Sequence, residues 1–188
     1  PLYSSAASDV YKRQYFQNRH VYRSIHSEYY TLGSGKISQY DEIIRKESER
    51  IGWDWRLLAS VIYQESRFNP EAESWAGAFG LMQLMPVTAK NYGITRSSSP
   101  ADQISAGVSF IKWLDDRFID DIPDHSERIK FILASYNIGY GHIEDARRLA
   151  ERYGDDPNIW HGSVEDWLLK KADPQYYTCL LYTSPSPR

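Results

Sequence analysis

The sequence predicts a domain built entirely, or nearly entirely, of α-helices. Apolar residues recur at helical spacing along most of the chain, and no segment shows the sustained two-residue alternation that is typical of a strand. Serine, aspartate and proline precede the apolar runs, where they can cap or open helices, and glycines follow them. No repeat at solenoid spacing accompanies these runs, so the sequence indicates one helical domain.

The first two predicted helices begin at polar caps. Ser38 is expected to cap a helix that ends near Gly52. Asp54 is expected to cap a second helix, which cannot continue past Pro70 because the residue before a proline disfavours helical geometry. A glycine-rich loop, SWAGAFG, follows, and Pro86 imposes a break before a short helix, TAKNYG. The apolar face of the first helix consists of Tyr40, Ile43, Ile44 and Ile51.

Two capping boxes are predicted further along the chain. Ser99 lies three residues before Asp102, with Pro100 at the first helical position, and Ser163 lies three residues before Asp166. The inward face of the helix after the first box consists of Ile104, Val108, Ile111, Leu114 and Phe118. Between the boxes, the turn NIGYG separates two more helices; the second is HIEDARRLAERYG, and the first is expected to bury Ile129, Ile132, Leu133 and Tyr136.

The two ends of the chain are interpreted as foreign sequence. The segments DVYKRQ, near the start, and CLLYTS, near the end, can be encoded by one DNA sequence translated on opposite strands, and that DNA resembles a transposon end used in sequencing libraries. We therefore expect residues 1–14 and 179–188 to be adapter-derived. Residues 15–36 are expected to be the remnant of an upstream domain and its linker, and residues 37–178 to be the helical domain.

The composition argues against some functions. The net charge is -3, the pI is about 6.0, and basic residues alternate with acidic ones, so nucleic acid is not expected as a partner. No apolar run is long enough to span a bilayer, so membrane association is expected only through parts of the protein missing from this sequence. The aromatic content of 14% suits a compact core or a sugar-binding cleft, where rings stack on saccharides.

One carboxylate lies on an apolar helix face. Leu58, Val61 and Ile62 share a face of the second predicted helix, and Glu65 continues it. The carbonyl groups at the helix end disfavour an ionised carboxylate, and so does desolvation, so the pKa of Glu65 is expected to rise. A protonated carboxyl group can act as the general acid that glycosidic cleavage requires. The alternative is a side chain that turns into water or pairs with Arg67.

Three segments, in order along the chain, carry a resemblance to a known family. YQESRFNP, GAFGLMQLMP and ASYNIGYGHIEDA resemble the signatures of soluble-type, goose-lysozyme-like lytic transglycosylases, which cut bacterial peptidoglycan. Residues 37–178 most resemble the membrane-bound lytic murein transglycosylase F group, also through WHGSVEDWL and DPQYY. The resemblance implies a lysozyme-like domain with a cleft between helical lobes, truncated here at its C-terminus. It also implies an intact protein in the bacterial periplasm, associated with the outer membrane.

The resemblance assigns roles to individual residues. Glu65 matches the catalytic acid and base, and Ser66 matches the serine beside it. Tyr136 and Asn137 match a pair whose tyrosine orients the catalytic carboxylate, and Ser135 stands where the family usually has alanine. The segment that lines the substrate cleft corresponds to Gly80, Leu81, Met82 and Gln83. The glutamine is expected to hydrogen-bond the substrate, whereas the methionine is by its own chemistry more typical of a core.

The implied reaction needs one carboxylate, no cofactor and no metal. Glu65 is expected to protonate the oxygen between N-acetylmuramic acid and N-acetylglucosamine. It then accepts the proton of the muramyl C6 hydroxyl, which closes on C1 to give 1,6-anhydromuramic acid. Glu71 and Glu73 lie in a polar loop and are interpreted as solvated. Another acidic loop lacks the spacing of an EF-hand and is also interpreted as solvated: Asp120, Asp121 and Asp124.

Peptidoglycan glycan strands are the expected partner, bound by a monomer. Two alternatives remain open at this point. One is a muramidase of the same fold that admits water and hydrolyses the bond, and the other is a glycan-binding domain without catalytic activity.

Overall fold

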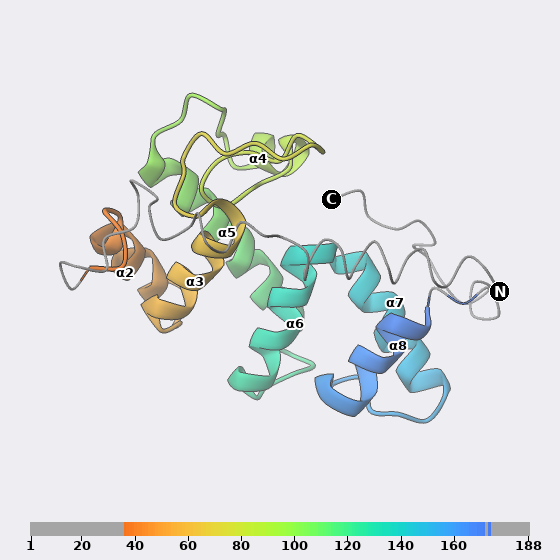
Figure 1. The fold of residues 1–188 in the computed structure, drawn as a ribbon. Coiled ribbons are helices and arrows are strands. Elements are labelled where there is room, and N and C mark those ends of the chain that lie inside the picture. The colour runs from red at the N-terminus through yellow and green to blue at the C-terminus, as the bar shows by residue number, and fades with distance from the viewer. Residues whose placement is uncertain (1–35, 172, 174–188) are drawn as a thin grey trace. The chain divides into compact units, whose positions relative to one another are not determined.

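The computed structural model describes residues 36–171 and residue 173 of the 188-residue chain. Both suspected adapter tails, and all but the last residue of the expected upstream remnant, lie outside the described residues. Helices make up the regular structure of the described part (Figure 1), and only isolated bridges join Glu73 to Phe79 and Phe79 to Leu84. The all-α prediction is therefore confirmed, and the cleft between lobes stays a prediction.

The described residues divide into two compact units between Lys112 and Trp113. Helix α5 (Pro100–Phe118) contributes residues to both units. Its predicted start is confirmed, because the hydroxyl of Ser99 accepts from the amide of Asp102 and donates to its carboxylate. All five residues predicted for the inward face of this helix are buried.

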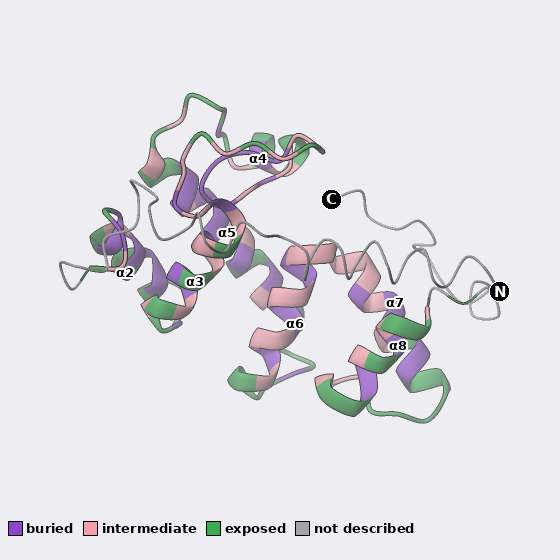
Figure 2. Ribbon diagram, viewed as in Figure 1, coloured by how far each residue is buried: buried purple, intermediate pink, exposed green. Residues whose placement is uncertain are grey.

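The first unit contains α2 (Asp41–Glu49), α3 (Trp55–Ser66), α4 (Pro86–Asn91) and the first part of α5. The short helix predicted after a break at Pro86 instead includes Pro86 as its first residue and ends at Asn91. As predicted, the Asp54 carboxylate caps α3 by accepting from the amide of Arg56 at 2.7 Å. The buried side chains of this unit include Ile44, Leu58, Ile62, Phe68, Leu81, Met82, Ile104, Val108 and Ile111. Figure 2 shows buried stretches of the ribbon in α2, α3 and α5.

The prediction that Ser38 caps the first helix is wrong. The N-cap is Tyr40, whose side chain makes no capping bond, and α2 begins at Asp41. Ser38 instead stabilises the turn before the N-cap, because its hydroxyl accepts from the amide of Tyr40 and donates to the Asp41 carboxylate. That carboxylate also accepts from the amides of Ile37 and Ser38, so an aspartate inside the first turn organises the entry to the helix.

Gln103, on α5, holds the loops between α3 and α5 together. Its side chain is buried, and its Oε1 accepts from the amide of Leu81 at 2.8 Å. Its Nε2 donates to the carbonyls of Pro70 and Ser98, at 3.3 Å and 3.0 Å. Gly80 makes room for this amide, because a Cβ there would lie 2.5 Å from Gln103 Oε1. One side chain thus fixes three loop segments that are far apart in the sequence.

The second unit contains the end of α5, α6 (His125–Ile138), α7 (Tyr140–Arg152), the irregular turn η4 (Trp160–Val164) and α8 (Glu165–Lys170). Helix α7 packs against both α6 and α8. The rings of Phe118 and Phe131 meet with centroids 5.7 Å apart in its core. In the part of the chain that the structure describes, no helix is both long and apolar enough to cross a membrane.

Three expectations for the second unit need correction. Ser163 does not cap α8; its hydroxyl donates to the carbonyl of Asp156. The buried face of α6 includes Phe131, whereas Ile129 and Leu133 are only half-buried. The acidic loop is also more than a solvated segment, because Asp124 caps α6 by accepting from the amide of Glu127.

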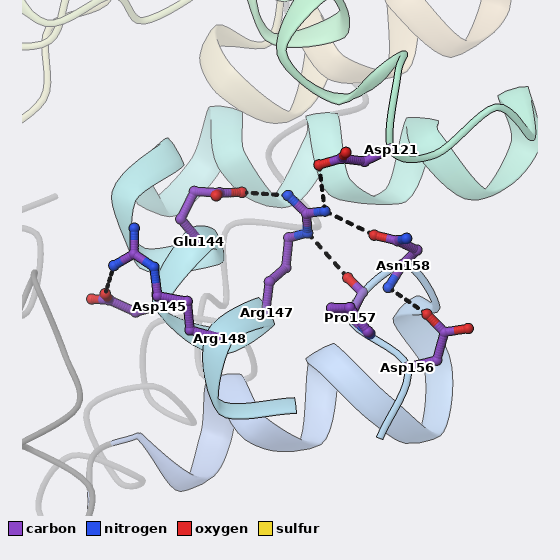
Figure 3. A network of polar contacts seen from close by, with 8 residues as sticks. All are labelled: Asp121, Glu144, Asp145, Arg147, Arg148, Asp156, Pro157 and Asn158. Atoms are coloured by element: carbon purple, nitrogen blue, oxygen red, sulfur yellow. Dashed lines mark hydrogen bonds and ion pairs between the residues drawn. The ribbon is translucent and has the colours of Figure 1, made fainter. Parts of the chain in front are cut away.

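A second aspartate of that loop, Asp121, joins a network around Arg147 (Figure 3). The guanidinium of Arg147 donates to carboxylates of Asp121 and Glu144, each at 2.8 Å, and to the side chain of Asn158 and the carbonyl of Pro157. Burial alone would lower the pKa of Arg147, but these carboxylates raise it, so the charge is retained. The network fastens α7 to the loop before η4 and to the loop before α6.

Ser135, on α6, carries a buried hydroxyl without compensation. The residue is fully buried, and its Oγ has no hydrogen-bond partner among the described residues. A polar group in this state costs free energy relative to the alanine that the family usually has at this position.

We predict that Gly80→Ala destabilises the first unit far more than Gly93→Ala. Both glycines have a positive φ, +80° and +70°, so both substitutions incur backbone strain, but a Cβ at Gly93 meets nothing within 4 Å. The two variants should differ in their free energy of unfolding by about 1–3 kcal/mol, and this difference reports the clash between the new Cβ at position 80 and Gln103. Denaturant unfolding of the two variants measures it, and equal losses would contradict the role of Gln103.

We predict that Ser135→Ala raises the free energy of unfolding by about 1 kcal/mol, because it removes the uncompensated hydroxyl. Ser60→Ala, at an exposed position of α3, is the control for the intrinsic preference of alanine for helices, worth a few tenths of a kcal/mol. Thermal and denaturant unfolding provide the measurement. A Ser135→Ala variant less stable than the starting protein would show that the hydroxyl has a partner after all.

Candidate active site

Glu65 lies at the end of a buried helix face. It is the penultimate residue of α3 and is half-buried, while Leu58 and Ile62 on the same face are fully buried. The last turn of α3 contains no basic residue. The negative end of the helix is therefore not neutralised within that turn, which favours the protonated form of a carboxyl group there.

The residue after Glu65 fastens this helix end to the predicted substrate segment. Ser66 is buried, and its hydroxyl lies 2.9 Å from the carbonyl oxygen of Leu81 and 3.1 Å from that of Ile62. A hydroxyl has one proton, so the two carbonyls share it. The bond to Leu81 spans fifteen residues of sequence and brings the backbone beside Glu65 against the segment that contains Gly80 and Gln83.

The backbone turns sharply at both of these segments. Arg67, Phe68 and Gln83 have φ values of 54°, 64° and 45°, and they are the three non-glycine residues with positive φ in the described ranges. Such geometry costs about 1–3 kcal/mol per residue and is found preferentially at functional sites. Phe68 is fully buried, with its ring 5.8 Å from that of Tyr63, so packing holds the strained turn in place. All three residues belong to the signature segments that contain Glu65 and Gln83.

Gln83 presents an amide oxygen. Its Nε2 donates to the carbonyls of Ala72 and Gly80, at 3.0 Å and 2.9 Å, and two carbonyl acceptors identify this atom as the nitrogen. Its Oε1 accepts no hydrogen bond from the part of the chain that the structure describes, and the residue is half-buried. The amide is therefore fixed on one side and available as an acceptor on the other, as the substrate role implied by the family requires.

Other predicted site residues are buried and stabilise the segment that contains Gln83. The side chains of Leu81 and Met82 are fully buried and belong to the core, and the backbone of Gly80 is buried beside them. Met82 packs so closely on α5 that a Cβ at Gly107 would lie 2.6 Å from it. The Ser66 hydroxyl also donates its hydrogen bonds to carbonyl groups of the protein. These positions support the site, and direct contact of their side chains with substrate stays a prediction.

Tyr136 and Asn137 belong to the second unit. Tyr136 is buried near the end of α6, and Asn137, beside it, is half-buried. The predicted contact between the Tyr136 hydroxyl and the Glu65 carboxyl joins two units and stays a prediction.

The neighbouring acids do not share the environment of Glu65. Glu71 is exposed, and Glu73 is exposed and accepts a hydrogen bond from Arg96 at 2.5 Å. That hydrogen bond, and the charge of Arg96, lower the pKa of Glu73 from its ordinary value of 4.5. Glu73 is therefore ionised near neutral pH and is not a proton donor, which agrees with its interpretation as a surface residue.

Gln103 is the residue that sequence reasoning missed. It directly precedes Ile104, the first residue of the predicted inward face of its helix, and it lies outside the helical phase of that face, so the apolar pattern does not mark it. Its partners lie 22 and 33 residues away, so no local pattern identified them.

The range that contains these segments matches known proteins. The family model described as Transglycosylase SLT domain matches residues 42–159. A membrane-bound lytic murein transglycosylase F from Desulfosudis oleivorans is 42% identical over 160 residues, which are 85% of this chain and 34% of the relative. A protein of the same name from Vibrio cholerae is 44% identical over 147 residues, 78% of this chain and 27% of the relative. The chain thus spans about a third or less of the length of these relatives.

A solved structure of an inactive mutant of lytic transglycosylase Slt from Pseudomonas aeruginosa covers 70% of this chain and 22% of its own, with 24% identity and a TM-score of 0.45. That likeness is too low to add to the argument. The family match covers more than half of the chain and includes Glu65, Gln83 and Tyr136. It confirms the resemblance carried by the three signatures: the chain belongs to the Transglycosylase SLT domain family.

Proposed function

We propose that the chain is the catalytic domain of a peptidoglycan lytic transglycosylase. Its substrate is the β-1,4 bond between N-acetylmuramic acid and N-acetylglucosamine, and its product carries 1,6-anhydromuramic acid. The observation that supports this most is the position of Glu65, half-buried at the end of α3 and fastened through Ser66 to the segment that presents Gln83.

Glu65 acts twice in the proposed reaction. Its protonated carboxyl donates a proton to the glycosidic oxygen, and the bond from C1 of muramic acid to that oxygen breaks as an oxocarbenium-like transition state forms. The C6 hydroxyl of the same sugar then attacks C1, and its proton passes to the Glu65 carboxylate. Each turnover returns Glu65 to its starting state, so no proton is lost or gained by the protein.

One carboxylate is sufficient for this route. Most glycosidases need a second carboxylate as a nucleophile or to activate water. Here the nucleophile belongs to the substrate, which gives it a high effective concentration at C1. The exposed Glu71 and the ion-paired Glu73 fit the same picture, since neither has the buried surroundings of a second catalytic acid.

The role of Gln83 is to orient the glycan. Its anchored amide offers an acceptor to a sugar hydroxyl or N-acetyl N–H group, at a place fixed by the left-handed backbone of the same residue. Tyr136 and Asn137 keep the roles that the family resemblance implies for them. The proposed setting is the bacterial periplasm, with the intact protein on the outer membrane and murein strands as its partner.

We predict that Glu65→Gln lowers the rate of murein cleavage by at least about a thousandfold, because glutamine has the shape of the acid but no proton to donate. Glu71→Gln is the matched control, an exposed glutamate of the same loop region, and its rate should stay within about twofold of the unchanged protein. The measurement is release of soluble muropeptides from purified sacculi, with folding of each variant checked by circular dichroism. Equal activity of Glu65→Gln and the unchanged protein would exclude Glu65 as the acid and leave only a glycan-binding role.

The chemical form of the product separates the two enzymatic functions. Mass spectrometry of the released fragments should find 1,6-anhydromuramic ends, which are lighter by one water than the reducing ends that hydrolysis leaves. A product mixture with hydrated reducing ends alone would contradict the transglycosylase route and support the muramidase.

A further inference from the structure

A hollow lies at the corner between α2 and α3, two helices that pack against each other (Figure 1). Its volume is about 380 Å³, which suits a small ligand. The lining combines a guanidinium, a serine, two carboxylates and two indole rings: Arg45, Ser48, Glu49, Asp54, Trp53 and Trp55. Charges of both signs therefore lie beside an apolar surface.

The guanidinium of Arg45 is held by an aromatic ring and has no anionic partner. Its Cζ lies 3.6 Å from the ring centroid of Trp55, so a cation–π contact between the two helices fixes its position. Within residues 36–171 and residue 173, no carboxylate pairs with this guanidinium. A ligand carboxylate can therefore accept its N–H groups without breaking an existing ion pair.

Glu49 supplies the opposite charge. It lies four residues after Arg45 on α2, at the spacing at which opposite charges can pair along a helix. The two side chains do not pair, because the guanidinium lies over Trp55 of the neighbouring helix. The Glu49 carboxylate has no hydrogen-bond or ion-pair partner in the part of the chain that the structure describes. Two opposite charges without partners thus line one hollow.

The rest of the lining is held in place by hydrogen bonds. Ser48 is buried; its hydroxyl donates to the Arg45 carbonyl at 2.8 Å, and its carbonyl accepts from the amide of Trp53 at 3.1 Å. The Asp54 carboxylate already accepts from the amide of Arg56. The hollow is therefore formed before any ligand arrives, which lowers the entropic cost of binding.

The charges decide which ligand fits this hollow. The carboxylates of Glu49 and Asp54 would repel a simple anion, and Arg45 would repel a simple cation. A zwitterion satisfies both signs, with its carboxylate on Arg45 and its ammonium group on Glu49. An apolar side chain of the same molecule can lie against Trp53 and Trp55.

We propose that the hollow between α2 and α3 binds a free α-amino acid with an apolar side chain. This binding site goes beyond the proposed function. Trp55 is the first residue of α3 and Glu65 the penultimate one, so the helix separates the two by about 15 Å. The binding uses no residue of the candidate active site, and it can be measured without any cleavage reaction.

The test titrates the full chain, labelled with ¹⁵N, with three probes. These are L-leucine, leucinamide, which lacks the carboxylate, and N-acetyl-leucine, which lacks the ammonium group. Leucine should bind with a Kd of roughly 1 mM and change the amide shifts of residues 45–49 and 53–55. Each analogue should bind about tenfold more weakly, because each loses one charge-assisted contact.

Two variants assign each charge of the ligand to its partner. Arg45→Gln should weaken leucine binding about tenfold and leave leucinamide binding within twofold, because leucinamide has no carboxylate to lose. Glu49→Gln should weaken leucine binding similarly and leave N-acetyl-leucine binding within twofold. The matched controls are Lys46→Gln and Glu42→Gln, which remove exposed charges of α2 outside the hollow and should change no affinity more than twofold.

Three results would overturn the amino-acid site. One is the absence of saturable leucine binding, or shift changes confined to other parts of the chain. Another is an analogue that binds as tightly as leucine, since one charge would then be sufficient. The third is an equal loss of leucine and leucinamide binding in Arg45→Gln, which would show that the variant disturbs the hollow instead of removing a carboxylate contact.

Discussion

The hydrogen bond between the Ser66 hydroxyl and the Leu81 carbonyl joins the two segments on which the proposed chemistry depends. Alone it is worth only about 1 kcal/mol, less than the strain of the left-handed residues that surround it. The arrangement persists because Gln103 holds the same loop through the Leu81 amide and the Pro70 carbonyl, and because Phe68 is packed into the core. The geometry near Glu65 is thus fixed by a buried polar side chain and an aromatic ring, neither of which has a role in the reaction.

This constraint explains why the signature residues divide into two kinds. Glu65 and Gln83 are half-buried and keep polar groups at the surface of the first unit, whereas Ser66, Leu81 and Met82 are buried and hold the segments together. The signature segments therefore contain residues that stabilise the loop structure as well as residues proposed to act on the substrate. Gly80 belongs to the second kind, since its missing side chain is the space that Gln103 fills.

Most of the helices were predictable because their signals are local. The Asp54 cap, the Ser99 and Asp102 pair and the period of apolar residues along α5 each lie within one or a few turns, and each is confirmed. The errors at Ser38 and Ser163 have a common cause: a serine before an apolar run can bond either the helix it precedes or another nearby group. Ser38 hydrogen-bonds the Asp41 carboxylate, and Ser163 hydrogen-bonds the Asp156 carbonyl.

The site was predictable in part. Helical phase marks Glu65 as an unusual carboxylate, and the family signatures assign roles to Glu65, Gln83 and Tyr136 that stay predictions. The clamp by Gln103 was not predictable, because it depends on contacts between residues that are far apart in sequence. Family membership likewise identifies the domain, while the activity of the chain rests on the chemistry of the Glu65 region.

The measurement that tests this account most directly is the location of the bound glycan. Glu65→Gln protein labelled with ¹⁵N, titrated with a peptide-free murein tetrasaccharide, reports binding residue by residue through its amide chemical shifts. The account predicts that the largest shift changes fall at residues 65–68 and 80–83, the two segments joined by Ser66. Saturable binding that leaves both segments unchanged and perturbs other parts of the chain would contradict it.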